Sequence, residues 1–110
     1  MSDLEALMWG LESDPMLSST FANLSWLDRS PDPERLRTRM WRATREIPRL
    51  RRRVVEGFGP LAPRWEDDPD FDLDRHLRWA SLPPGATDLD VRALAVELAA
   101  TPFDRDHPLW

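Results

Sequence analysis

Apolar residues recur at helical spacing in three stretches of the chain. In the first stretch, residues 3–12, Ser2 and Glu5 form a capping box at the start. The apolar stripe that follows has spacing i, i+3, i+4 and i+7 and consists of Leu4, Leu7, Met8 and Leu11. This spacing predicts a short amphipathic helix that ends near the Ser-Asp-Pro of residues 13–15.

Two longer stretches follow the same rule. In residues 34–47, Asp32 is the expected N-cap, Pro33 the first helical position and Pro48 the stop. The apolar stripe of this second helix is Leu36, Met40, Ala43 and Ile47. A third helix follows the "PPGATD" break and ends at Thr101 and Pro102, and its stripe is Val91, Leu94, Ala95, Leu98 and Ala99.

Four stretches between these helices have strand-like patterns, and the end of the chain has a fifth. Residues 20–28 alternate loosely between apolar and polar, residues 49–57 and 63–68 read as two strands joined by the "GFGPLA" turn, and residues 76–82 read as a third. At the end of the chain, Leu109 and Trp110 follow Pro108 directly, which predicts the start of a buried strand. Because helices and strands alternate, the fold class is α/β (α+β), a mixed sheet with three main helices in one domain.

Composition narrows the setting of the chain. It has no Cys, which excludes disulfides, thiolate metal sites and a cysteine nucleophile, and all 15 basic residues are Arg. No apolar run approaches the roughly 18 residues that span a bilayer, and the first residues are acidic where a signal peptide would be basic. These features favour a cytoplasmic protein, or one peripheral to a membrane or lipid inclusions.

The net charge of -5 conceals a basic region at residues 29–53, which hold ten Arg against three acids. A nucleic-acid binder would be basic overall, so nucleic acid is not an expected partner. Four arginines follow the second helix directly: Arg49, Arg51, Arg52 and Arg53. The favoured interpretation of these arginines is that they lie on a solvated helix face and strand surface. The alternative is that they contact an anionic surface, which could be lipid, a CoA phosphate or an acidic partner.

The sequence contains no recognisable active site of its own. Neither His76 nor His107 has a second His or a carboxylate at a spacing that would build a metal site or a triad, so we expect structural or surface roles for both. The acidic run at residues 66–74 lacks the Gly and the closing Glu of a calcium loop and is expected to be a solvated turn. We therefore predict no catalytic residue, no metal site and no cofactor loop.

Four stretches, in order and spacing, resemble the N-terminal part of the bacterial wax ester synthase/diacylglycerol acyltransferase family. They are "LEALMWGLESDPMLSS", "IPRLRRRVVE", "PRWEDDPDFDLDRHLR" and "TPFDRDHPLW". The last two are the most specific, because they match the family patterns "FDL..H" and "(L/F)DR..PLW". The resemblance runs from Met1 to Trp110.

This resemblance implies one half of a fold like that of chloramphenicol acetyltransferase, in the superfamily of CoA-dependent acyltransferases. In the family, a His-His-x-x-x-Asp-Gly motif supplies the base that activates a hydroxyl for attack on acyl-CoA, and no cofactor beyond this substrate is implied. The sequence contains no adjacent His pair and stops at Trp110, before that motif. Pro108, Leu109 and Trp110 would, by resemblance, help shape the acyl or acceptor tunnel, and plain core packing is the alternative.

Two hypotheses for function follow. The first is that residues 1–110 form a partial N-terminal domain of an enzyme that acylates diacylglycerol or a long-chain alcohol. Such a domain would be inactive alone. It would come either from a truncated gene or from a split enzyme whose C-terminal half is the missing partner. The second is a non-catalytic lipid- or protein-binding module that uses the arginine-rich region. The family's activity is thus expected only of the complete enzyme.

Overall fold

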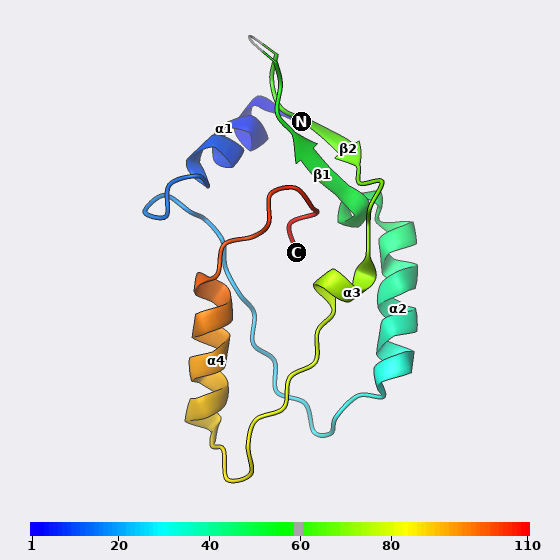
Figure 1. Cartoon of the computed structure of the whole chain (residues 1–110), viewed down its shortest axis with the longest axis vertical. Helices are drawn as coiled ribbons and strands as arrows, with labels where there is room; N and C mark the ends of the chain where they lie inside the picture. Colours follow the sequence, from blue (N-terminus) through cyan, green and yellow to red (C-terminus); the bar gives the residue numbers. More distant parts are fainter. Residues whose placement is uncertain (59–60) are drawn as a thin grey trace.

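The computed structural model describes residues 1–58 and 61–110 (Figure 1). Its helices are α1 (Asp3–Leu11), α2 (Pro33–Glu46), α3 (Leu73–His76) and α4 (Asp88–Ala100), with a 3-10 turn, η1 (Pro48–Arg51), after α2. Its strands are β1 (Arg52–Val55) and β2 (Arg64–Asp67). The three main helices therefore lie within a few residues of where the sequence predicts them.

Side-chain caps fix the starts of these helices. The Ser2 Oγ accepts a hydrogen bond from the Glu5 backbone N–H at 3.2 Å, and the Ser2 N–H donates to the Glu5 carboxylate at 2.7 Å. Asp32 caps α2 by accepting from the Arg35 N–H at 2.7 Å, and Asp90 accepts from the Thr87 N–H at 2.6 Å. Each cap satisfies a backbone donor that the helix itself leaves unpaired, so local sequence decides where the helices begin.

The two strands form an antiparallel hairpin in which Val54 is opposite Trp65. The Asp68 N–H donates to the Arg51 C=O at 2.8 Å and continues the pairing by one step. A Cβ at Gly57 would lie 1.8 Å from the Leu61 carbonyl oxygen, so the close approach of the two chain segments requires glycine there. Of the predicted turn at 57–62, residues 59–60 lie outside the described residues.

Three predicted strands are wrong. Residues 20–28, 77–82 and 108–110 have no strand geometry, and His76 ends α3, a short helix that the sequence did not predict. The sheet is thus a two-stranded antiparallel hairpin where a larger mixed sheet was expected. A strand exists only when a neighbour accepts its backbone hydrogen bonds, and within the described residues these segments have no such neighbour.

The predicted apolar stripes are only partly buried. In α1 the buried side chain is Trp9, outside the stripe, whereas Leu4 and Leu7 are exposed. In α2, Thr44 is fully buried, and Ile47, directly after the helix, is exposed. Among the described residues the buried hydrophobic side chains are Trp9, Val54 and Leu73, and Pro108 is buried as well. This is a small core for an elongated molecule of 54 × 33 × 19 Å in which α2 and α4 stand on opposite sides (Figure 1). In this structure the stripes of α1 and α4 have little to pack against.

Crossing a bilayer requires a longer and more apolar helix than any found among the described residues.

Replacing Leu73 tests whether the core lies where the structure places it. Leu73 begins α3 and is 1% exposed. We expect Leu73→Ala to lower the free energy of unfolding by about 2–4 kcal/mol, because it leaves a cavity at the most buried apolar side chain. Leu89→Ala is the matched control, since Leu89 lies near the start of α4 and is 74% exposed. Urea denaturation of both variants checks the difference, and an equal loss would contradict it.

Candidate functional site

Residues 104–110, which we call the C-terminal segment, contact most of the fold. Figure 1 shows this segment in red, running from the end of α4 into the middle of the molecule. Its side chains and backbone reach α1, the hairpin and α3. The two stretches with the most specific family resemblance, residues 63–78 and 101–110, therefore meet in space.

The most buried polar contact of this junction joins Asp68 to His107. The His107 Nδ1 donates to the Asp68 Oδ2 at 2.9 Å, and the Asp70 N–H donates to the other carboxylate oxygen at 2.9 Å. Arg75 contacts the same imidazole ring through its Nη1. A ring with its proton on Nδ1 satisfies both neighbours, since its Nε2 can then accept from Arg75.

This contact corrects two expectations. Asp68 is only 7% exposed, so the acidic run at 66–74 is not simply a solvated turn. His107 does have a carboxylate partner, but the two residues are separated by 39 positions. Burial acts to raise the pKa of Asp68, and the hydrogen bonds from His107 and from the Asp70 N–H outweigh it, so the pKa lies below its usual value.

The last residue is held by a second histidine. The His76 ring stacks between Phe71 and Trp110, with ring centroids 5.5 and 4.5 Å away. The His76 Nδ1 donates to the Trp110 carbonyl at 2.8 Å, and the Trp110 indole N–H donates to the Leu50 carbonyl at 2.8 Å. His76 and His107 therefore both have structural contacts, in keeping with the expected roles.

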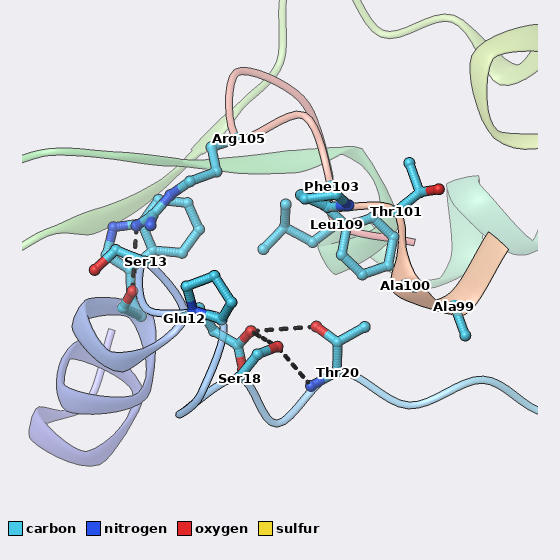
Figure 2. Close-up of a pocket in the computed structure, with 13 residues that line it drawn as sticks. Glu12, Ser13, Ser18, Thr20, Ala99, Ala100, Thr101, Phe103, Arg105 and Leu109 are labelled. Atoms are coloured by element: carbon cyan, nitrogen blue, oxygen red, sulfur yellow. Dashed lines mark hydrogen bonds between the residues drawn. The ribbon is translucent and has the colours of Figure 1, made fainter. Parts of the chain in front are cut away.

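A cavity of about 650 Å³ lies between the end of α1, the loop after it, the end of α4 and the C-terminal segment (Figure 2). Apolar side chains form much of its wall, among them Trp9, Pro15, Pro102, Phe103 and Leu109. Three residues were predicted to shape a tunnel. Leu109 lines this cavity, whereas Pro108, the residue before it, is buried, and Trp110 packs on His76. A chamber of this size and lining suits a hydrocarbon chain.

Polar groups gather on one side of the cavity. Figure 2 shows the Glu12 carboxylate bonded to Ser18 and Thr20, with distances of 2.6 Å to the Ser18 Oγ and 3.2 Å to the Thr20 Oγ1. The Ser18 hydroxyl and the Ser19 N–H lower the pKa of Glu12, so it stays ionised and ties the loop to the end of α1.

Arg105 borders the same cavity and joins it to the hairpin. Its guanidinium lies 3.6 Å from the centre of the Trp9 ring, and its Nη2 donates to the Trp9 carbonyl at 3.2 Å. The Trp9 indole N–H donates to Glu56 at 2.6 Å. Sequence reasoning missed Trp9, Glu12 and Arg105, because residues 96 positions apart carry no local signal that they are neighbours.

The four arginines predicted to contact an anionic surface all have partners within the chain. Arg49 pairs with Glu5, and Arg52 pairs with Asp67 at 2.9 Å. Arg51 lies over the rings of Trp41 and Phe71, and Arg53 donates to the Asp106 carbonyl at 3.3 Å. Contact with an anionic surface stays a prediction. No cluster of three or more potential metal-binding side chains occurs in residues 1–58 and 61–110.

Comparisons with known proteins agree on one family. The model of the wax ester synthase/diacylglycerol acyltransferase catalytic domain matches residues 1–110. A putative diacylglycerol O-acyltransferase of Mycobacterium tuberculosis strain H37Rv is 40% identical over the whole chain, and a second of the same strain is 32% identical over the whole chain. A probable diacylglycerol O-acyltransferase of that strain is 42% identical over 59% of the chain. The chain spans 23% of the length of the first relative and 24% of the second, and no solved structure matches it.

The buried carboxylate gives a prediction for pH dependence. Because the pKa of Asp68 is lower in the folded state, its contribution to stability is present above the unfolded value near 3.8 and is lost as the pH falls through the folded value. We expect Asp68→Asn to be less stable than wild type at pH 7, and the difference to shrink as the pH falls below about 3.8.

Urea denaturation at pH 7 and at pH 2.5 measures this difference. Asp70→Asn is the control, because Asp70 lies two residues away and is exposed. A stability difference between wild type and Asp68→Asn that stays constant over this range would contradict the ionic role of Asp68.

Proposed function

The chain belongs to the wax ester synthase/diacylglycerol acyltransferase family, and from this membership we propose that it forms the N-terminal, substrate-binding part of an O-acyltransferase. The reaction of the complete enzyme transfers a fatty acyl group from acyl-CoA to the hydroxyl of diacylglycerol or a long-chain alcohol. The hydroxyl oxygen attacks the thioester carbonyl, a C–O bond forms, the C–S bond breaks and CoA leaves as the thiol.

The cavity beside the C-terminal segment is the observation that carries this proposal. It is large enough for part of a hydrocarbon chain, and it is lined by Leu109, which belongs to the Pro-Leu-Trp of the family pattern. The Asp68–His107 bond holds the backbone that carries Leu109. We propose that the chain of the acyl group or of the lipid acceptor lies against this apolar wall, with Arg105 at its polar border.

The catalytic base comes from outside these 110 residues in this proposal. The sequence has no adjacent His pair, so we propose that a segment with the His-His-x-x-x-Asp-Gly motif completes the site and removes the proton of the attacking hydroxyl. In this proposal His76 and His107 are positioning residues. The His76 Nδ1 is bonded to the Trp110 carbonyl and the His107 Nδ1 to the Asp68 carboxylate, so both rings hold the C-terminal segment in place. We expect the 110-residue chain alone to be inactive, and the complete enzyme to work at a membrane or lipid-inclusion surface.

Filling the cavity tests the proposal in a complete enzyme. The test uses a chimera in which residues 1–110 replace the matched part of the M. tuberculosis relative that is 40% identical. The substitution Leu109→Trp is introduced into this chimera. Because the larger side chain occupies the chamber, kcat/KM should fall roughly tenfold or more for long chains and less for short ones. The measurement varies the chain length of acyl-CoA and of the alcohol acceptor, one at a time.

Leu61→Trp serves as the matched control, because Leu61 is 64% exposed and lies away from the cavity lining. An equal loss of activity for every chain length in Leu109→Trp, or no loss at all, would remove the cavity from the substrate path. A chimera that folds but transfers no acyl group would refute the proposed function.

A further inference from the structure

Two segments leave their backbone groups without hydrogen-bond partners. In the described part of the chain, no backbone N–H or C=O of residues 21–28 or 78–82 makes a hydrogen bond within the protein. We call residues 20–28 and 77–82, which extend these stretches by Thr20 and Leu77, the unpaired segments, although the N–H groups of those two residues are bonded. Figure 1 shows them as long connections without helix or strand, one from α1 to α2 and the other from α3 to α4. Unpaired backbone of this length offers an edge to another strand.

The side chains of the unpaired segments have the pattern of strands. In residues 20–28, Ala22, Leu24 and Trp26 alternate with polar Asn23 and Ser25. In residues 77–82, Leu77 and Trp79 are separated by Arg78. Alternation of this kind is typical of a strand with one face on a core, yet Trp26 and Trp79 are both more than half exposed. The sequence of both segments therefore fits a sheet that this chain does not complete.

The total surface of the molecule shows how much is uncovered. The chain exposes 9091 Å², whereas a compact monomer of 12.8 kDa exposes about 6,300 Å². The radius of gyration is 16.6 Å, against about 13 Å for a compact chain of this length. The excess of roughly 2,800 Å² is several times the roughly 800 Å² that each partner contributes to a standard interface. Only an extensive, obligate interface would cover it.

We propose that the unpaired segments take up β-strands of the polypeptide that makes up the other three quarters of the relatives' length. The inference rests on the proposed function, because it takes the acyltransferase relatives as the guide to this partner. Main-chain hydrogen bonds to residues 20–28 and 77–82 would supply the pairing, and the exposed apolar side chains would enter a shared core. The resulting sheet would be the mixed sheet that the sequence pattern predicts.

A longer polypeptide fits this surface better than a second copy of the chain. The exposed apolar side chains lie on α1, on both unpaired segments and on α4, which are several separate parts of the molecule. A two-fold contact between copies uses one self-complementary patch and would leave the other parts in water. The chain spans about a quarter of its relatives, and the remaining three quarters are long enough to cover several parts at once.

Hydrogen exchange measured by mass spectrometry tests the pairing. The isolated 110-residue chain is compared with the chimera in which it replaces the matched part of the 40% identical relative. We expect exchange in residues 20–28 and 77–82 to slow at least about tenfold in the chimera, because paired amides exchange only on opening. The β1–β2 hairpin is the internal reference and should be protected in both proteins.

Trp26→Glu and Phe58→Glu form a pair of variants that differ in their place in the chain. Both aromatic side chains are exposed in this chain, at 55% and 91%, and Phe58 lies in the turn after β1. Trp26→Glu should leave the isolated chain nearly unchanged but lower the melting temperature of the chimera, since Trp26 shares a face with Ala22 and Leu24 and a carboxylate there would enter the shared core. Phe58→Glu should have little effect on either protein.

Three results would overturn the inference. One is rapid exchange of both segments in a chimera whose hairpin is protected. Another is protection of both segments in the isolated chain together with a dimer mass by light scattering, which would assign the surface to a second copy. If the chimera does not fold, the 110-residue chain and the rest of the relative are co-expressed as two polypeptides. The third result that would overturn the inference is that these two polypeptides do not co-purify.

The exchange data also separate this inference from the proposed function. Protected segments in a chimera without acyltransferase activity would refute the function and leave the strand pairing intact. An active chimera whose segments still exchange rapidly would support the function and refute the pairing.

Discussion

The hydrogen bond between His107 and Asp68 fixes the position of the C-terminal segment, and much of the remaining fold depends on that position. Asp68 is buried directly after β2, and both of its carboxylate oxygens are used, one by His107 and one by the Asp70 N–H. Removing one partner would leave a buried polar group unsatisfied, which costs more than the bond itself contributes. The segment is thereby tied to the end of the hairpin, where Arg53 also donates to the Asp106 carbonyl.

Several other contacts follow from this attachment. With His107 in place, Arg105 lies over Trp9, and Trp110 lies on His76 with its indole N–H on the Leu50 carbonyl. Trp9 in turn binds Glu56, so α1 is joined to the end of β1 through a single tryptophan. The cavity exists because these contacts hold α1, the end of α4 and the C-terminal segment around a space lined largely by apolar side chains.

The same arrangement explains why the molecule is extended. Residues 104–110 meet the hairpin, α1 and α3, while α4 and the connections before α2 and α4 stay largely exposed. A chain of this size needs to bury about two thirds of its unfolded surface to be stable alone, and the excess exposed area shows that these residues fall short of a compact domain. Family membership is consistent with this picture, since the relatives are about four times as long as the part that matches.

The sequence by itself determined the local structure of this protein. The caps at Ser2 and Asp32, the stop at Pro48 and the hairpin at Gly57 act over a few residues, so they can be read directly from the chain. The family motifs are also visible in the sequence, and Leu109 belongs to one of them.

Only the tertiary structure decided which faces are buried, which strands form and which side chains meet. The helical stripe of α1 did not predict the burial of Trp9, and the spacing of charges did not predict that Asp68 and His107 are neighbours. The alternation in residues 20–28 has the period of a strand, but a strand requires a partner, and pattern alone does not say whether one is present. Such outcomes depend on contacts between residues 39 to 96 positions apart, about which local periodicity holds no information.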